Sequence, residues 1–581
     1  MVCGATRKAI ETDFDPGIPY FYPDPASQQN IGLSGLDSNQ SNCPKNIRFL
    51  AKVNKVNSEL WHNYRGRSRK RLLLFTLNDD QEEVFMNENI ENTQDYFSDL
   101  TDDQKTALKA MLDGKNVFVT GGAGTGKSFV LKRFVEIARS QARNVLVTAP
   151  TGIAALNAEG CTLHRAFRLG TGVLSPYNSI NLKKVPDAVK YADTIIIDEI
   201  SMCRLDLFDY VYRVLKRVAE DKEARWHRKA LASGMKLNAL SWGRNFDTQI
   251  IVVGDFYQLP PVLNEDDYKA LSQVYDRRTF GRYDKGIDKG FAFQGLHWKD
   301  CQFEKVILRQ IMRQKDISFA NALNQARVGD FSCLRYLETK TSSEPLDDGI
   351  WLCAKNKAAD KINREQLETI SEDAKTYRAA VSGVVSWTDM PTDKVLTLKV
   401  GARVMILTND KEDKYVNGSL GTIKRLPRLP GGDIDITLEN GAVVSVSPYE
   451  WKITVPEAVK ELDMKDLKER VKIIQKEIGQ FRQYPLRLAY AVTMHKSQGQ
   501  TFQHVNVQAE AFAAGQMYVA LSRATTPGGM YIDGIIYPQS IKASPAVAAF
   551  YEEIEKEYEK EQNEQKQSER PIRRRQLARA I

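Results

Sequence analysis

The sequence predicts an α/β fold built on a parallel sheet that helices cover on both faces. Two observations support this prediction. From about residue 99 onward, near-continuous apolar, β-rich runs alternate with helical stretches, and such strands are typical of parallel sheets buried on both faces. One run also precedes a glycine-rich loop at residues 121–128, in a strand–loop–helix context. The clearest strands are Val117–Thr120, Val145–Thr148, Thr194–Ile197 and Ile250–Val253.

The glycine-rich loop has the spacing G-x-x-x-x-G-K-S of a phosphate-binding loop. Its residues are Gly121, Gly122, Ala123, Gly124, Thr125, Gly126, Lys127 and Ser128. Glycines let backbone N–H groups close around phosphate oxygens, and the following helix points its positive dipole end at the same anion. We expect Lys127 to reach the β- and γ-phosphates and the Ser128 hydroxyl to ligate Mg²⁺.

Two acids follow the phosphate loop by about 70 residues. The apolar run Thr194–Ile197 ends in Asp198 and Glu199, and a parallel strand exposes its carboxyl end to the ligand crevice. Asp198 can hold Mg²⁺ there, and Glu199 can polarise an attacking water. Alone, this pair suits a helix-starting turn equally well, but its place after a phosphate loop favours a hydrolytic site.

The bulk composition is that of a soluble protein with several domains. A length of 581 residues suggests two to four domains. The net charge of +8 permits a nucleic-acid partner without requiring one. The 7 cysteines are scattered, so we expect reduced thiols and no zinc site. No apolar run approaches the length of a membrane span, and the start lacks a hydrophobic signal core, so we expect neither secretion nor a membrane partner.

The outer parts of the chain differ from the centre. Residues 1–95 are expected to form a partly disordered extension. Within it, Tyr64–Arg71 is either a basic nucleic-acid arm or nuclear signal, or a solvated turn. Val395–Thr454 is rich in β-formers and turns, which predicts a small barrel, and a charged helix is expected over Pro456–Phe481. Residues 549–581 are expected to form a charged tail, in which a helix from about Tyr551 frays into a disordered basic end that is either solvated or bound to nucleic acid. These basic runs leave a nucleus or mitochondrion as alternatives to the cytoplasm or a bacterial nucleoid.

Eight motifs follow one another in order between about residues 100 and 526. They are GGAGTGKS (121–128), APTGIAA (149–155), TLHRAF (162–167), DEISM (198–202), GDFYQLPPV (254–262), LRQIMRQ (308–314), MHKSQGQTF (494–502) and YVALSRAT (518–525). This series resembles the petite-integration-frequency (PIF) group of RecD-like helicases in superfamily 1, as do VNGSLGT (416–422) and the stretch at 484–501.

The resemblance implies two RecA-like parallel-sheet P-loop NTPase domains, with a small β-barrel insertion in the second. The first domain would cover 96–304 and carry a small wedge insertion at about 168–186. The second would cover 305–394 and 482–548, with the barrel and charged helix inserted at 395–481.

The resemblance also implies roles for individual residues, with ATP and Mg²⁺ as cofactors. Gln104 would read the adenine edge, which suits an amide that donates and accepts. Gln258 would sense the γ-phosphate, and Arg313 and Arg523 would be the arginine fingers that stabilise the departing phosphate. His164 taken alone reads as a structural histidine. The residues expected to touch single-stranded DNA are Pro150, Thr151, Thr162, His164, Phe167, His495, Ser497, Gln498 and Thr501.

The implied function is an ATP-dependent DNA helicase. It would move 5′ to 3′ on single-stranded DNA and unwind forked duplex as a monomeric motor, in replication, recombination, repair or telomere-type maintenance. The alternatives are a helicase of the broader RecD or phage type, a nucleotide kinase sharing the loop, or a DNA-dependent ATPase switch or recruitment protein without processive unwinding. The chain departs from the group at 220–247, where Arg225–Lys229 either touches DNA or forms a solvated helix face.

Overall fold

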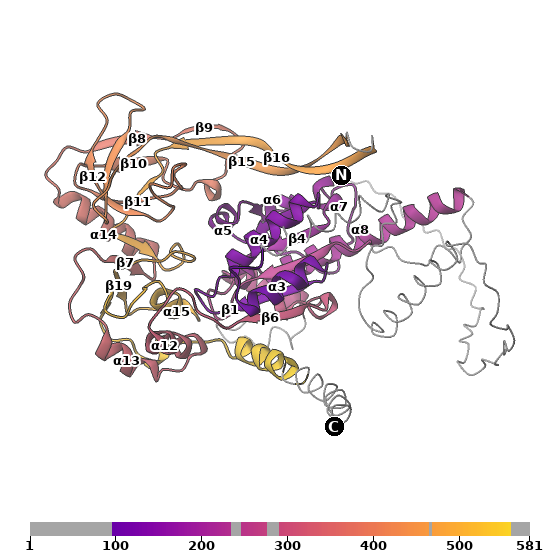
Figure 1. The fold of residues 1–581 in the computed structure, drawn as a ribbon, viewed down its shortest axis with the longest axis horizontal. Coiled ribbons are helices and arrows are strands. Elements are labelled where there is room, and N and C mark those ends of the chain that lie inside the picture. The colour runs from indigo at the N-terminus through magenta and orange to yellow at the C-terminus, as the bar shows by residue number, and fades with distance from the viewer. Residues whose placement is uncertain (1–95, 234–245, 276–289, 464–467, 559, 561–581) are drawn as a thin grey trace, which may run out of the picture. The chain divides into compact units, whose positions relative to one another are not determined.

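The computed structural model describes residues 96–233, 246–275, 290–463, 468–558 and 560 (Figure 1). The predictions for 1–95, for 234–245 within the longer charged stretch, and for the basic end of the chain lie outside these residues. Among the described residues, no helix is both long enough and apolar enough to cross a bilayer.

A six-stranded parallel sheet forms the centre of the first domain. Its strand order is β3-β2-β4-β5-β1-β6, and every neighbouring pair is parallel. The four predicted strands are confirmed, within one residue at their ends. The strands are β1 (Val117–Gly121), β2 (Val145–Ala149), β3 (Cys161–Thr162), β4 (Thr194–Ile197), β5 (Gln249–Val253) and β6 (Glu304–Leu308).

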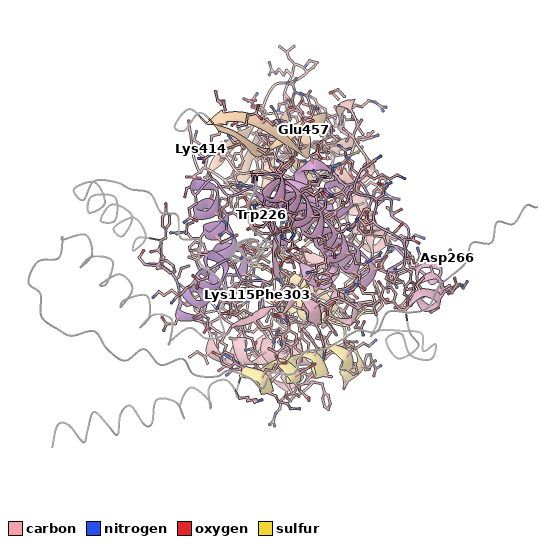
Figure 2. All side chains as sticks on the ribbon, turned by 90° about the vertical axis from the view of Figure 1, so that its right-hand side faces the viewer. Lys115, Trp226, Asp266, Phe303, Lys414 and Glu457 are labelled. Carbon is pink, nitrogen blue, oxygen red and sulfur yellow. The ribbon has the colours of Figure 1, made fainter. Side chains whose placement is uncertain are left out.

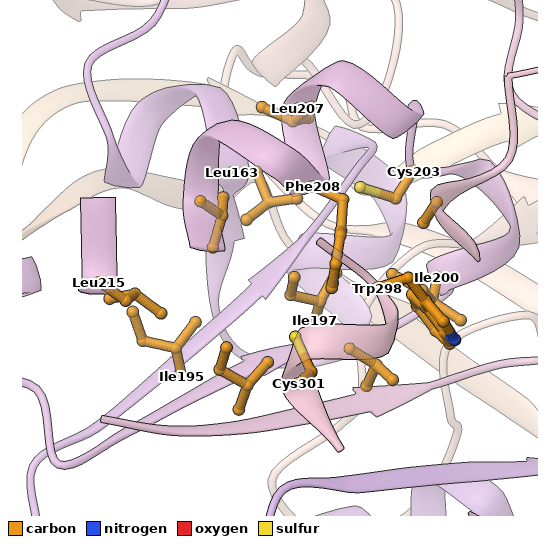
Figure 3. Close-up of a cluster of buried hydrophobic side chains, with 14 of the residues drawn as sticks. Leu163, Ile195, Ile197, Ile200, Cys203, Leu207, Phe208, Leu215, Trp298 and Cys301 are labelled. Carbon is orange, nitrogen blue, oxygen red and sulfur yellow. The ribbon is translucent and has the colours of Figure 1, made fainter. Parts of the chain in front are cut away.

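Both faces of this sheet are buried, as predicted. Successive side chains of a strand point to opposite faces, so Ile195 and Ile197 of β4 join one apolar cluster and Ile196 joins another. Figure 3 shows Ile195 and Ile197 in the first cluster together with Phe208 and Trp298. The helices of this domain are α3 (Asp102–Leu112), α4 (Lys127–Ser140), α5 (Gly152–Asn157), α6 (Leu163–Ala166), α7 (Asp187–Tyr191), α8 (Leu205–Ala232) and α10 (Glu265–Val274).

Helix α8 contains the first part of the longer charged stretch. Its buried residues recur at helical spacing through Val211, Val214, Leu215 and Val218, which is the periodicity of a helix packed on one side. Beyond that point most side chains are half-buried or exposed, and Figure 2 labels Trp226 on this part of the helix.

The second domain contains a parallel sheet of order β18-β7-β19-β20. The two-domain α/β fold class is therefore confirmed. The predicted boundary after residue 304 is wrong by one strand, because β6 pairs along its length with β1 of the first sheet. The elements are β7 (Ile350–Cys353), β18 (Ala491–Thr493), β19 (Val505–Gln508), β20 (Met530–Asp533), α12 (Ile317–Val328), α13 (Cys333–Lys340), α14 (Asn356–Thr369) and α15 (Gln516–Leu521).

An antiparallel β domain is inserted into the second domain. Its main sheet has the order β14-β13-β12-β11-β17, and two smaller sheets lie outside it. The insertion begins before the predicted residue 395, because β8 and β9 already pair with its strands. The strands are β8 (Lys375–Arg378), β9 (Ala380–Gly383), β10 (Val395–Leu398), β11 (Arg403–Ile406), β12 (Leu420–Arg425), β13 (Ile434–Leu438), β14 (Val443–Val446) and β17 (Leu486–Leu488).

The charged helix predicted over Pro456–Phe481 is wrong. This segment forms two long antiparallel strands, β15 (Tyr449–Asp463) and β16 (Lys468–Gln483), which run side by side in Figure 1, and Figure 2 labels Glu457 on the first. The charges that suggested a helix are paired across the strands instead. The cross-strand ion pairs are Lys452–Glu477 (3.3 Å), Glu457–Lys476 (2.8 Å), Lys460–Glu469 (3.1 Å) and Glu461–Lys472 (3.5 Å).

The helix predicted at the start of the charged tail is present, but it begins earlier than expected and packs into the core. Residues 545–558 form a helix whose Val547, Tyr551 and Ile554 are buried in the core of the first domain. Their spacing of three and four residues places them on one side of the helix. The charges between them face outward, so composition alone hides this apolar stripe.

One side chain of the first domain, that of Asn144, hydrogen bonds to the backbone of β16. The Asn144 amide donates to the Val471 carbonyl (2.8 Å) and accepts from the Ile473 N–H (3.1 Å). It thus satisfies two backbone groups as a neighbouring strand would.

We expect Asn144→Ala to lower the free energy of unfolding by about 1–3 kcal/mol, because it leaves partly buried backbone groups unpaired. Urea denaturation measures the loss. Asn181→Ala, which removes an amide that accepts from Lys183 in an exposed turn, is the control and should change stability far less. Equal losses in the two variants would contradict a special role for Asn144.

Candidate functional site

The phosphate loop joins β1 to α4, as predicted. Gly124 and Gly126 have φ of 79° and 83°, which side-chain-bearing residues rarely adopt. The Lys127 ammonium donates to the carbonyls of Gly121 (2.8 Å) and Gly122 (2.9 Å). Burial lowers the pKa of Lys127, while Asp255 and Glu199 oppose that shift. This lysine is therefore a buried cation held inside the loop.

The two predicted acids lie together at the carboxyl end of β4. Asp198 accepts from the Glu199 N–H at 2.9 Å. Burial, and then the neighbouring Glu199 carboxylate, raise the pKa of Asp198 to about 7. Burial also raises the pKa of Glu199, although Lys127 opposes it. Glu199 has φ of 50°, and such left-handed strain in a residue other than glycine is typical of functional positions.

A cleft of about 690 Å³ is lined by Ser128, Asp198 and Glu199 on one side. Residues 416–420 and 499–503, from the second half of the chain, line it as well. The hydroxyl and carboxylate oxygens of Ser128 and Asp198 are the hard donors that Mg²⁺ prefers. A cation would also offset the crowding of two half-buried carboxylates, so the donor set fits the predicted metal.

Gln258 and Gln498 complete a network around Glu199. The Gln498 amide donates to the Glu199 carboxylate at 2.8 Å and to the Gln258 side-chain oxygen at 3.3 Å. Gln498 was predicted to touch DNA. It is buried against the Glu199 carboxylate instead, because the loop after β18 turns toward the first domain. The glutamine of the second domain thus contacts both the Glu199 carboxylate and the glutamine of the first domain.

The two predicted arginine fingers lie close to this network. Arg523 is fully buried and donates to the carbonyls of Val519, Ser497 and Gln500. Burial and, secondarily, repulsion from Arg313 lower the pKa of Arg523 to about 9. Burial also lowers the pKa of Arg313. Two desolvated cations next to a buried acid form a site that an anion would stabilise.

Two contacts between the domains are absent from the sequence prediction. The Tyr518 hydroxyl accepts from the Ala123 N–H of the phosphate loop at 2.7 Å. Arg327 of α12 forms a two-point ion pair with Asp255 of the first domain, at 3.0 and 2.9 Å. Tyr518 lies within the YVALSRAT motif, so a sequence signal indicated this position. Arg327 lies in no motif, and no sequence signal marks it.

Gln104 is bound to the phosphate loop. Its amide nitrogen donates to the Thr125 carbonyl at 3.1 Å, and its oxygen accepts from the Thr101 N–H at 3.0 Å, closing the capping box of α3. An amide has two donor hydrogens and two acceptor lone pairs. One of each is left after these bonds, and the side chain is buried in this conformation, so its predicted role stays a prediction.

The residues predicted to touch DNA fall into two groups. Thr151 and Thr162 are half-buried and cap α5 and α6, where each hydroxyl accepts a backbone N–H. Ser497 is fully buried and donates to the Met494 carbonyl. Phe167 is 3% exposed and packs on Tyr210. Neither Ser497 nor Phe167 can offer its side chain to a DNA strand in this conformation, so the prediction is wrong for these two residues.

The other members of this set keep accessible side chains. Pro150, His164 and His495 are half-buried, and Thr501 is exposed. Burial lowers the pKa of His164 and of His495, which favours their neutral forms. Their contact with DNA stays a prediction.

Several known proteins resemble this chain. The model of the PIF1-like helicase family matches residues 99–275. An ATP-dependent DNA helicase Pif1 of Campylobacter jejuni is 29% identical over 76% of this chain and 96% of its own length. A PIF1 helicase of Danio rerio is 30% identical over 79% of this chain, which spans 64% of that protein.

Solved structures agree with these sequence matches. The crystal structure of Bacteroides sp Pif1 in complex with ADP-AlF4 has a TM-score of 0.64 and 32% identity, and it covers 79% of this chain and 97% of its own. Bacteroides Pif1 bound to single-stranded DNA has a TM-score of 0.52 over the same shares of the two chains, with 32% identity.

The raised pKa of Asp198 predicts a pH-dependent stability. In the folded protein its pKa is about 7, against an ordinary 3.8. At pH values between these two, folded Asp198 keeps a proton that the unfolded chain has released. The stability that this proton contributes is fully present below the unfolded value and is lost as the pH rises through about 7.

Relative to Asp198→Asn, the wild type should therefore lose stability between pH 5 and pH 8, by at most about 3 kcal/mol. Urea denaturation of both proteins without nucleotide or Mg²⁺, at the two pH values, measures the difference. A stability difference that stays constant with pH would contradict the raised pKa.

Proposed function

The chain belongs to the PIF1-like helicase family, and we propose that it is a DNA motor in which ATP hydrolysis at the junction of the two α/β domains drives unwinding of duplex DNA. The observation that carries this proposal is the Glu199–Gln498–Gln258 network. Its carboxylate and one amide come from the first domain, and the other amide comes from the second. A hydrolytic site that needs both domains can convert a change at the phosphate into a change between domains.

The residues of the site suit hydrolysis of a phosphoanhydride. Glu199, once ionised, orients and polarises the attacking water through its free carboxylate oxygen. Lys127 and the backbone N–H groups of residues 121–128 bind the phosphates, and Arg313 and Arg523 stabilise the charge that develops on the transferred group. Mg²⁺, held by Ser128 and Asp198, supplies further charge neutralisation when bound. We carry over from the family that Gln104 recognises the adenine of ATP.

The coupling to DNA follows from the position of Gln498. It lies in the MHKSQGQTF motif, between the catalytic acid and the exposed Thr501. A change in the Glu199 hydrogen bond therefore reaches a loop that we propose contacts single-stranded DNA, together with Pro150, Thr151, Thr162, His164 and His495. Breaking one base-pair step costs about 1.4 kcal/mol of stacking, which a nucleotide-driven cycle supplies readily.

The relatives named above are ATP-dependent DNA helicases, and they support the helicase activity. Movement from 5′ to 3′, action as a monomer, and location in a nucleoid or a nucleus are carried over from the family as proposals.

The direct test is strand separation by the purified chain. We expect MgATP to drive unwinding of a duplex with a 5′ single-stranded tail and not of one with a 3′ tail, because the proposed movement is 5′ to 3′. Lys127→Ala should lose both unwinding and ATPase activity, by at least 100-fold, because the phosphates lose their buried cation. A gel assay with labelled strands and a phosphate-release assay measure the two activities.

DNA-stimulated hydrolysis without unwinding of either duplex would instead support an ATPase switch. Unwinding of the 3′-tailed duplex alone would overturn the polarity and retain the helicase.

The segment 168–186 is the proposed wedge at the fork. It has no strand and is held by Arg204 and Arg213, which donate to the carbonyls of Gly172, Ser175 and Asn178. Its apolar residues, such as Leu174 and Leu182, pack on the core, so deleting the segment would also damage the fold. Tyr177 points outward, with 76% of its surface exposed.

Tyr177→Ala should therefore slow unwinding severalfold and leave single-strand-stimulated ATPase within about twofold, because an exposed aromatic side chain at a fork supports an unpaired base by stacking. Tyr537→Ala, at a tyrosine 55% exposed, is the matched control and should affect neither. If both rates fall together after Tyr177→Ala, the wedge placement is wrong.

A further inference from the structure

The C-terminal helix at 545–558 follows the second domain in sequence but packs into the first. Phe550 stacks on Phe293 at 4.3 Å and lies edge-on to Phe256 at 5.5 Å. Ion pairs secure its outer side. They are Lys299–Glu553 (3.1 Å), Arg309–Glu555 (2.7 Å) and Lys305–Glu557. The helix thus returns the chain from one domain to the other, with an apolar seat and charged edges.

Tyr551 on this helix reaches the strand ends that carry the catalytic motifs. Its hydroxyl lies 2.6 Å from the Thr120 hydroxyl, directly before the phosphate loop, and accepts from the Phe256 N–H at 3.2 Å. It also lies 3.5 Å from an oxygen of Asp255. Burial and the Asp255 carboxylate raise the pKa of Tyr551, so the hydroxyl keeps its proton and remains a donor.

The same tyrosine completes the seat of Arg327. The guanidinium of Arg327 lies over the ring of Tyr257 at 4.6 Å and over the ring of Tyr551 at 5.3 Å, and the two rings stack at 4.8 Å. Asp255 neutralises the guanidinium with two hydrogen bonds. Aromatic faces and a paired carboxylate together make a desolvated arginine favourable. The contact between α12 and the first domain therefore combines residues from three separate parts of the chain, which are Arg327, the segment 255–257 and Tyr551.

This seat lies three residues from the catalytic network. The Gln258 N–H donates to the Asp255 carbonyl at 2.9 Å, so the orientation of Asp255 fixes the turn that presents Gln258. On the other side, Gly515 at the start of α15 leaves no room for a side chain, because a Cβ there would strike the carbonyls of Tyr257 and Gln258. Residues of both domains therefore contact the turn at 255–258.

We propose that Tyr551 is a positioning residue that couples ATP hydrolysis to DNA: by fixing Asp255 against Arg327 it holds Gln258 in reach of Gln498 and Glu199. Tyr551 is absent from the hydrogen bonds of Lys127 and from the lining of the cleft, so we expect its effect on hydrolysis to exceed its effect on nucleotide binding. This inference rests on the proposed function, since it needs a DNA-stimulated ATPase.

The test uses the full chain and compares Tyr551→Phe with Tyr275→Phe. Each variant removes one buried hydroxyl from a tyrosine next to an aspartate. Tyr275 donates to Asp209 at 2.9 Å within the first domain and packs in a separate apolar cluster with Leu205 and Leu271. We expect Tyr551→Phe to lower the DNA-stimulated kcat about 5- to 10-fold, since one hydrogen bond that orients the network is lost. KM for ATP and the affinity for oligo-dT should stay within twofold, and Tyr275→Phe should leave all three values unchanged.

A second arm separates positioning from general destabilisation. Arg327→Lys retains the charge but loses the two-point pair, so it should lower the stimulated kcat similarly, and the double variant should be no worse than the poorer single one, as expected for residues acting in one unit. Melting temperatures of Tyr551→Phe and Tyr275→Phe should fall by similar amounts.

Three results would overturn the inference while leaving the helicase intact. They are a stimulated kcat of Tyr551→Phe within twofold of wild type, an equal loss in Tyr275→Phe, and additive losses in the double variant. If the wild type itself shows no stimulation by DNA, the proposed function fails and this inference fails with it.

Discussion

The hydrogen bond between Gln498 and Glu199 is the interaction on which the rest of this structure depends. It joins the catalytic acid of one α/β domain to a loop of the other, and the Gln258 oxygen shares the same amide. Because Glu199 is buried and close to Asp198, its charge is costly and responds strongly to each polar neighbour. Small shifts between the domains therefore alter the chemistry, and changes in charge at the acid alter the fit between the domains.

Other contacts between the domains support that bond. Tyr518 occupies a backbone donor of the phosphate loop, and Arg327 meets Asp255 in a seat of aromatic rings. Each is a directional contact between desolvated groups, so each tolerates little displacement. Interfaces of this kind pass between discrete arrangements more readily than they deform continuously. This property suits a motor that must alternate between two states of its cleft.

Local pattern was enough to predict the elements whose cause is local. The strands of the first sheet are apolar runs, and the phosphate loop and Asp198–Glu199 are short motifs that act within a few residues of one another. The errors have a common physical origin in partners distant along the chain. The charges of 456–481 suggested a helix because their partners on the facing strand could not be seen. Tyr551 lies in a charged stretch, and its partners Thr120 and Asp255 are about 430 and 300 residues away. Gln498 lies in a motif associated with DNA, and only the turn of its loop places it at Glu199.

The paired strands β15 and β16 have one more consequence. From 449 to 483 the chain carries eight lysines and arginines and seven aspartates and glutamates, and many of these face each other across the two strands. Such a ribbon has almost no net charge at a distance of several ångströms, although it is among the most polar parts of the molecule. A polyanion passing nearby is neither attracted nor repelled by it. The paired strands can therefore stay bound to Asn144 of the first domain while they contribute little long-range charge.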